Sequence, residues 1–245
     1  MANQRVALVT GSATGIGRAV AWQFAERGFA VTVNYSRSKD EAEVTADGVR
    51  SRGGEPLIVR ADVSDETAVV AMVESTVATL GGLDVLVNNA ATTHFIAHTD
   101  LAGLTDEVWD DILRVNLKGT FYGCRAAMPF LKARSGNIVN VASIAGISGS
   151  GSSIAYAASK GAVITLTKSL ARAFAPEVRV NAVAPGPVET RWLADHPEMI
   201  ESAMLLTPLK RPASPDDVAD VVLFLANQTS LMTGQILVVD GGRTL

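Results

Sequence analysis

The chain has 245 residues, of which 48% are hydrophobic and 19% are charged, and its 21 basic and 25 acidic side chains leave a formal charge of -4. This composition excludes an intrinsically disordered chain and argues against nucleic acid as the main partner. Cys124 is the only cysteine, which excludes an internal disulfide or multi-thiolate metal site and favours a reducing, cytoplasmic compartment. No apolar run approaches the ~18 residues of a membrane-spanning helix, so we expect no membrane insertion.

Short β-branched runs alternate with longer segments of helical period. Helix starts are indicated by Ser38 three residues ahead of Glu41, by Ser64, and by Ser214-Pro215 ahead of Asp217. The strand candidates lack polar alternation, as is typical of parallel strands covered by helices on both faces. We therefore predict one α/β domain over residues 1–245, with seven strands at 5–10, 30–34, 56–60, 83–87, 136–141, 177–183 and 235–239.

A glycine-rich turn follows the first predicted strand and opens a helix. Its sequence is Thr10-Gly11-Ser12-Ala13-Thr14-Gly15-Ile16-Gly17, with the spacing G-x-x-x-G-x-G. Such a turn lets backbone N–H groups and the positive helix end approach a pyrophosphate. A plain structural turn is the alternative, but the strand and helix that flank it favour dinucleotide binding.

A candidate proton-transfer set lies in the second half of the chain. Tyr156 and Lys160 are four residues apart, which places them on one face of a helix. Reducing a carbonyl leaves an alkoxide that needs a proton, and a tyrosine can donate it if a nearby cation lowers its pKa from about 10. Ser143 follows the fifth strand, at the sheet edge where ligands bind. An exposed helical pair is the alternative for Tyr156 and Lys160.

Taken together, seven landmarks in this order resemble the short-chain dehydrogenase/reductase family over nearly the whole chain. They are Thr10 to Gly17, Asp62-Val63, Asn88-Asn89-Ala90, Asn116, Ser143, Tyr156 with Lys160, and Pro185 to Thr190. The resemblance implies a Rossmann-type doubly wound sheet of order 3-2-1-4-5-6-7, in a homotetramer. Within the family, the chain looks most like the 3-oxoacyl-(acyl-carrier-protein) reductases.

The resemblance also implies roles for individual residues. Ser143 binds the substrate oxygen, Tyr156 is the general acid, Lys160 lowers the tyrosine pKa and binds the nicotinamide ribose, and Asn116 anchors a proton-relay water. A polar residue that satisfies backbone at a helix kink is the alternative for Asn116. Ala91 replaces a usual glycine, which predicts altered loop geometry near the nicotinamide. Further cofactor contacts are expected from Gly11, Ser12, Thr14, Gly15, Ile16, Gly17, Asp62, Val63, Asn88, Ala90, Pro185, Gly186, Val188 and Thr190.

The end of the second strand indicates which nicotinamide cofactor is bound. An acidic residue there would bond the ribose 2′-hydroxyl and repel a 2′-phosphate. The chain instead has Asn34-Tyr35-Ser36-Arg37-Ser38, and Arg37 can offer a fork of donors to a phosphate. NADP(H) is favoured over NAD(H), although Thr14 stands where many NADP(H) enzymes carry a basic residue. A solvated Arg37 is the alternative.

The predicted activity is NADPH-dependent reduction of a carbonyl to a secondary alcohol, with a 3-oxoacyl thioester as the expected substrate. The alternatives are a reductase of a small free ketone, sugar or cyclic alcohol, and a catalytically idle cofactor-binding sensor. An apolar substrate is suggested by a lid-like segment containing Trp192, Leu193, Met199, Met204, Leu205 and Leu206.

Five other residues are considered for binding and set aside or left open. Arg134 is a candidate contact for an acyl carrier protein, whereas Glu177 argues against docking of that acidic partner. His94 and His98 are expected to lie at the pocket rim or in a solvated loop rather than to bind metal. Cys124 is expected to be a small buried hydrophobe.

Overall fold

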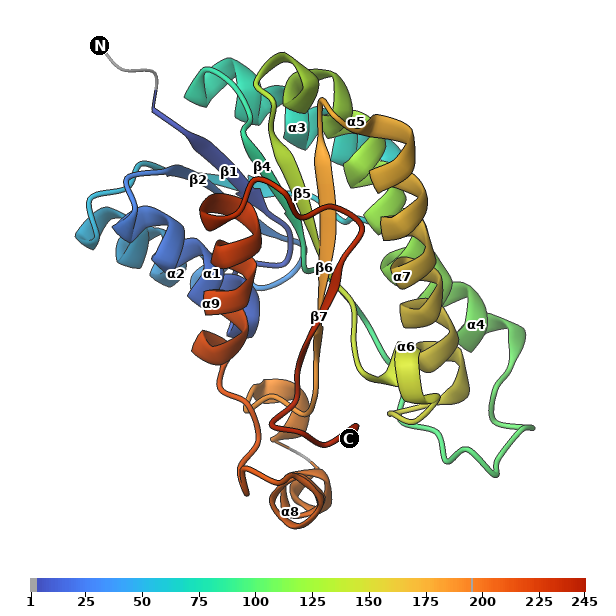
Figure 1. Ribbon diagram of the computed structural model, residues 1–245. Helices are drawn as coiled ribbons and strands as arrows, with labels where there is room; N and C mark the ends of the chain where they lie inside the picture. The colour runs from blue at the N-terminus through green and yellow to red at the C-terminus, as the bar shows by residue number, and fades with distance from the viewer. Residues whose placement is uncertain (1–3, 195) are drawn as a thin grey trace.

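The computed structural model describes residues 4–194 and 196–245, which contain a seven-stranded parallel sheet of order β3-β2-β1-β4-β5-β6-β7 (Figure 1). This confirms the predicted doubly wound sheet. Strand bounds differ from the expected ones by at most two residues. The strands are β1 (Val6–Val9), β2 (Ala30–Tyr35), β3 (Pro56–Arg60), β4 (Val85–Asn88), β5 (Asn137–Val141), β6 (Arg179–Pro185) and β7 (Ile236–Val239).

The start and end of β6 show why its bounds shifted. Val178 N donates to Phe174 O, so the chain is still leaving the preceding helix at that point. Pairing with β7 then continues to Pro185, opposite Val239. The neighbouring strand, rather than local residue preference, therefore sets where β6 ends.

Helices cover both faces of the sheet (Figure 1). One face carries α1 (Gly15–Glu26), α2 (Lys39–Ser51) and α9 (Pro215–Leu223), and the other carries α3 (Glu66–Leu80), α5 (Thr120–Ala133) and α7 (Ile154–Phe174). The remaining helices are α4 (Asp106–Leu113), α6 (Ala145–Ser148) and α8 (Pro197–Leu206), with π-helical turns at Arg114–Gly119 and Phe224–Gln228 and a 3₁₀ turn at Arg191–Leu193. Within the described chain, none of these helices has the length and apolar character needed to cross a bilayer.

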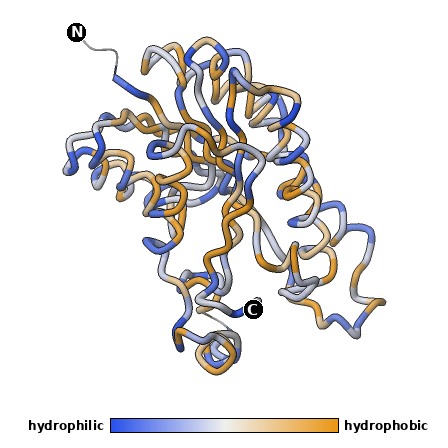
Figure 2. Tube along the Cα trace, in the orientation of Figure 1, coloured by the Kyte–Doolittle hydropathy of each residue, from blue (hydrophilic) through white to orange (hydrophobic). Residues whose placement is uncertain are grey.

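The central strands are buried on both sides, which explains their unbroken apolar sequences. In β1, Ala7 and Val9 pack with Phe24 on one face, whereas Val6 and Leu8 pack with Met72 on the other. Figure 2 shows the hydrophobic segments gathered in the middle of the sheet. Because successive side chains point to opposite faces, burial of both requires apolar residues at every position.

The predicted helix starts are close to the observed ones, but only one uses the expected side chain. Ser214 and Asp217 form a capping box at α9, as predicted. At α3 the cap is Asp65 rather than Ser64, since the Asp65 side chain accepts from two backbone N–H groups. Ser38 occupies the N-cap position of α2, yet its side chain makes no capping bond. The Ser38 hydroxyl is therefore available to bond a group other than the α2 backbone.

Candidate active site

The carboxyl ends of β1 to β6 open into one cleft of about 700 Å³. The sheet order reverses between β1 and β4, and ligands of doubly wound folds bind at such a switch point. The predicted residues that line the cleft are Gly11, Thr14, Gly15, Ile16, Asn34, Tyr35, Ser36, Arg37, Asp62, Val63, Ala90, Ser143, Tyr156, Lys160, Pro185, Gly186, Val188 and Thr190.

The glycine-rich turn after β1 has the open backbone that a pyrophosphate requires. Gly11 adopts φ +61°, a left-handed conformation that favours glycine. A Cβ at this position would lie 2.9 Å from Ala90 Cα. The turn also leads directly into α1, whose N-terminus carries the positive end of the helix dipole. The residues present therefore fit a dinucleotide pyrophosphate.

Two asparagines hold this turn in place. Asn34 Oδ1 accepts from Gly11 N at 3.0 Å, while Asn34 Nδ2 donates to Ala61 O at 3.0 Å. Asn89 Nδ2 donates to Thr10 O at 2.9 Å and to Gly11 O at 3.1 Å. Asn89 was not among the predicted site residues, although it stands in the middle of the Asn88-Asn89-Ala90 landmark. Both side chains therefore fix the backbone of the glycine-rich turn through hydrogen bonds.

Four predicted residues, Ser12, Gly17, Asn88 and Asn116, are not among the cleft-lining residues. The Ser12 hydroxyl is buried and donates to Val9 O at 2.7 Å. A Cβ at Gly17 would lie 2.6 Å from Asn89 Nδ2, so this glycine allows close packing below the turn. These two residues support the loop without presenting a side chain to a ligand.

Asn88 belongs to a buried ladder of side-chain hydrogen bonds below the cleft. Asn88 Nδ2 donates to Asn140 Oδ1 at 2.9 Å, and Asn140 Nδ2 donates to Thr167 Oγ1 at 3.0 Å. The ladder joins β4, β5 and α7. Asn88 Nδ2 also lies 3.3 Å from Cys124 Sγ. Cys124 is buried as expected, and burial raises its thiol pKa to about 12.

One end of the cleft is lined by Asp62 and by arginines. Burial acts to raise the pKa of the Asp62 carboxyl, but hydrogen bonds from Ser64 and the charges of Arg114 and Arg37 bring it below its ordinary value. The ionised carboxylate can accept a hydrogen bond from an adenine amino group. Arg114 was not predicted; it begins the π-helical turn after α4 and lines the same cleft.

Three of the four predicted catalytic residues meet in the cleft. Tyr156 and Lys160 lie one turn apart on α7, and Ser143 follows β5. The Ser143 hydroxyl accepts from Ala145 N at 3.1 Å and lies near enough to the Tyr156 phenol to act against the rise of its pKa. Lys160 Nζ lies 5.8 Å from the Tyr156 ring centroid and donates to Val141 O at 2.8 Å. Ser153 caps α7 by accepting from Tyr156 N, which fixes the start of this helix.

The ionisation of this set differs from the prediction. Burial raises the pKa of Tyr156 to about 12, and the nearby Ser143 hydroxyl only partly opposes this. Burial also lowers the pKa of Lys160 to about 8, because this lysine is only 3% exposed. Burial therefore moves the Tyr156 pKa in the direction opposite to the predicted fall.

The Asn116 side chain is bonded to the loop after β4 and to α7, and its anchoring of a relay water stays a prediction. It lies within the π-helical turn Arg114–Gly119, where Oδ1 accepts from Thr92 N at 2.8 Å. Its Nδ2 donates to Thr92 O and to Ser159 Oγ, both at 3.0 Å. The side chain thus satisfies backbone at a helix irregularity and steadies the loop after β4. Asn116 makes no hydrogen bond to Lys160, whose ammonium donates to Val141 O instead.

Aromatic side chains surround the opening beside Tyr156. Trp192 meets the Tyr156 ring edge-on, with centroids 6.2 Å apart, and both line the cleft together with Leu193. Phe95 lines it as well and stacks on His196 at 3.7 Å. The outer part of the predicted lid, Met204, Leu205 and Leu206 on α8, is exposed, and the side chain of Met199 lies outside the described residues.

The two histidines after β4 each contact an oxygen atom of a nearby residue. His94 Nε2 lies 2.9 Å from Asp111 Oδ2, and His98 Nε2 lies 3.2 Å from Gly151 O. Across residues 4–194 and 196–245, no three His, Cys, Asp or Glu side chains are grouped to hold a metal ion.

The two residues considered for carrier-protein docking lie at the wrong edge of the sheet. Arg134 Nη1 contacts Asp84 Oδ2 at 3.1 Å, and Asp84 precedes β4. Glu177 precedes β6 in the same way. Both are therefore at the amino edge, whereas the cleft is at the carboxyl edge. The prediction that Arg134 serves a partner at the pocket mouth is wrong, and the argument from Glu177 no longer applies.

The chain is similar to known proteins over nearly its full length. A family model described as enoyl-(acyl carrier protein) reductase matches residues 11–244. A Streptomyces violaceoruber protein, described as ketoacyl reductase 2 of the granaticin polyketide synthase, is 49% identical over 98% of this chain and 96% of its own. The Staphylococcus aureus 3-oxoacyl-(acyl-carrier-protein) reductase FabG is 41% identical, over 96% of both chains.

A solved structure agrees with these relatives. It comes from Burkholderia xenovorans, is described as a short-chain dehydrogenase/reductase, and is 37% identical with a TM-score of 0.94 over 99% of both chains. The fold matches what the sequence resemblance implied. The chain belongs to the short-chain dehydrogenase/reductase family.

Proposed function

We propose that this protein reduces 3-oxoacyl thioesters to 3-hydroxyacyl thioesters with NADPH. The observation that carries the proposal is the meeting of Ser143 and Tyr156 in one cleft, with Lys160 one turn away. Relatives described as ketoacyl and 3-oxoacyl reductases support this choice of substrate. A cytoplasmic location, predicted from the single cysteine, and a homotetramer, implied by the resemblance, remain predictions.

The residues in the cleft can bind the substrate carbonyl and supply the proton that this reaction needs. When bound, the reduced nicotinamide supplies the hydride that is added to the substrate's carbonyl carbon. Ser143 donates a hydrogen bond to the carbonyl oxygen, and Tyr156 delivers its hydroxyl proton to that oxygen as negative charge develops. The raised pKa keeps Tyr156 protonated at neutral pH, so the proton is present when needed. Lys160 holds a positive charge beside the phenol and favours the phenolate that remains.

The substrate is tested by comparing thioesters with free carbonyl compounds. We expect kcat/KM for acetoacetyl-CoA to exceed that for free ketones by about 100-fold, because the apolar opening formed by Phe95, Trp192 and Leu193 can bind the remote part of the substrate. NADPH oxidation would be followed at 340 nm across thioesters, cyclic ketones and sugars. A free ketone or sugar turned over more efficiently than any thioester would overturn the proposed substrate.

Cofactor choice is tested at Arg37. Arg37 lines the cleft beside Tyr35 and Ser36, with no carboxylate at the end of β2 to bind a ribose 2′-hydroxyl. We expect Arg37→Ala to weaken NADPH binding about 10-fold and to leave NADH binding unchanged, because a charge-assisted bond to the 2′-phosphate is lost. Fluorescence titration of each nucleotide measures this. Unchanged NADPH affinity would contradict the assignment.

A further inference from the structure

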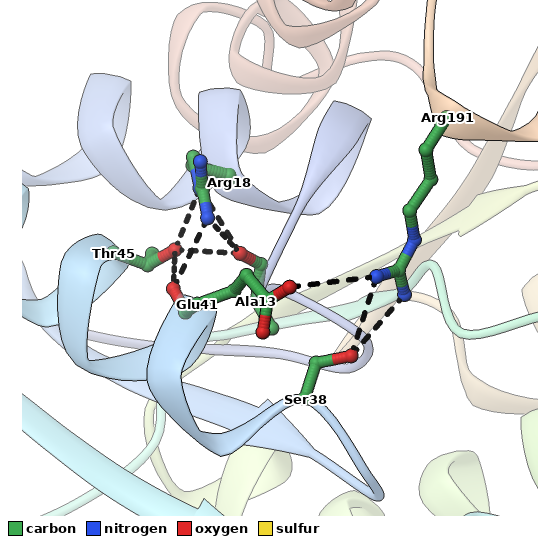
Figure 3. Close-up of polar contacts among 6 residues, drawn as sticks. All are labelled: Ala13, Arg18, Ser38, Glu41, Thr45 and Arg191. Atoms are coloured by element: carbon green, nitrogen blue, oxygen red, sulfur yellow. Dashed lines mark hydrogen bonds and ion pairs between the residues drawn. The ribbon is translucent and has the colours of Figure 1, made fainter. Parts of the chain in front are cut away.

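The segment after β6 crosses the cleft and lies against the glycine-rich turn. A Cβ at Gly15 would be 3.2 Å from Thr190 Cγ2, which shows how closely the two segments approach. The 3₁₀ turn Arg191–Leu193 begins at the next residue. This crossing places Arg191 beside the start of α2, on a wall of the cleft formed by a distant part of the sequence (Figure 3).

The Arg191 side chain points toward α2 and makes only weak contacts there (Figure 3). Its Nη1 and Nη2 both lie 3.3 Å from Ser38 Oγ, and Nη1 is 4.0 Å from Glu41 Oε1. The Arg191 side chain is 59% exposed. A solvated ion pair at this separation contributes little, so the guanidinium can exchange Glu41 for a stronger anionic partner.

The surroundings of Ser38 suit a phosphate. Its hydroxyl makes no capping bond to α2, and Arg37 next to it lines the same cleft. Arg191 is close enough to Arg18 for its charge to add to the lowering of the Arg18 pKa, which is caused mainly by burial. Arg18 itself is occupied, with Nη2 2.6 Å from Ala13 O and Nε 3.0 Å from Thr45 Oγ1. Of the arginines that line the cleft, Arg37 precedes Ser38 directly and Arg191 contacts its hydroxyl, so both are placed to meet an anion at Ser38.

We propose that Arg191 is a second ligand for the 2′-phosphate of NADPH, reaching it from the wall opposite Arg37. This proposal rests on the proposed use of NADPH. A phosphate dianion held by Arg37, Arg191 and the Ser38 hydroxyl receives charge-assisted bonds from two independent segments. Such a site needs no basic residue at Thr14, because the second cation comes from the segment after β6.

The contact also has a consequence for the substrate side of the cleft. Arg191 directly precedes Trp192 and Leu193, which line the opening beside Tyr156. Holding Arg191 on the phosphate therefore holds this aromatic wall over the reacting groups. A cofactor that lacks the 2′-phosphate leaves Arg191 with only Ser38 and Glu41 as partners.

Comparing Kd for nucleotides with and without the 2′-phosphate tests the contact between Arg191 and that phosphate. We expect Arg191→Ala to raise Kd for NADPH and for 2′,5′-ADP about 10-fold, with NADH and ADP changed less than about twofold. Arg191→Lys should give an intermediate loss, since it keeps the charge but not the fork. Glu41→Gln should tighten 2′,5′-ADP about threefold by removing the competing carboxylate. Calorimetry measures all four ligands.

The matched control is Arg50→Ala, which removes the same charge from an exposed pair with Asp47 on α2, away from the cleft-lining residues. Its affinities should equal those of the wild type. If Arg191→Ala weakens NADPH and NADH equally, Arg191 only positions the segment and the proposal is wrong. If Arg191→Ala changes neither, Arg191 is not a ligand. A wild-type protein that binds NADH as tightly as NADPH would instead overturn the cofactor assignment itself.

Discussion

Tyr156→Phe is expected to lower kcat about 1000-fold, while Kd for NADPH stays within about twofold of the wild-type value. The substitution keeps the ring that packs against Trp192 but removes the hydroxyl that lies near Ser143. Loss of a positioned general acid costs about 10² to 10⁴ in rate, and the alkoxide then has no donor within reach. Steady-state turnover of acetoacetyl-CoA and a separate nucleotide titration measure the two quantities.

Tyr122→Phe provides a matched control for Tyr156→Phe. Tyr122 lies on α5, packs against the core on that face of the sheet, and is not among the residues that line the cleft. Its hydroxyl can be removed without touching the reacting groups, so turnover should stay near the wild-type value. Retention of more than a few per cent of turnover by Tyr156→Phe would show that another group delivers the proton.

Lys160→Met is expected to reduce activity and, at neutral pH, to stabilise the fold. We expect kcat to fall about 100-fold because the charge that favours the phenolate is lost. Lys160 is buried, and its pKa is lowered from 10.5 to about 8, which corresponds to about 3 kcal/mol of destabilisation at pH 7. Leaving Val141 O without its donor costs about 1 to 2 kcal/mol. The expected net gain is about 1 to 2 kcal/mol.

The pH dependence of this gain has a defined sign. Between pH 8 and 10.5 the unfolded wild-type chain binds a proton at Lys160 that the folded chain has released, so wild-type stability rises with pH across this window. The methionine variant lacks this rise. The difference in unfolding free energy between variant and wild type should therefore be largest below pH 8 and shrink toward pH 10.5. Tyr156, with its pKa raised to about 12, acts on both proteins at higher pH.

Urea unfolding at several pH values from 7 to 10 measures this difference. Lys168→Met is the matched control, because Lys168 is an exposed lysine on the same helix, α7. Its unfolding free energy should differ from that of the wild type by an amount that does not vary with pH. A pH-independent difference for Lys160→Met would contradict burial of a titrating ammonium.

Much of the fold was predictable because its signals are local. The apolar runs, the glycine-rich turn and the four-residue spacing of Tyr156 and Lys160 each depend on neighbours in sequence. The place of Ser143 in the cleft followed from its position after β5, since the carboxyl ends of parallel strands meet at one sheet edge.

What sequence reasoning missed depends on contacts between distant segments. Arg191 reaches Ser38 across 153 positions, and Asn89 holds a turn 78 positions away. The direction of the Tyr156 pKa depends on burial, which residue spacing does not report. Tertiary placement decides each of these cases.

The hydrogen bonds from Asn88 through Asn140 to Thr167 anchor one side of the cleft but not the other. They tie α7, and with it Tyr156, to the middle of the sheet. Trp192, by contrast, is carried on the short turn after β6. Substitutions in that turn can therefore reshape the opening without moving the helix that positions Tyr156.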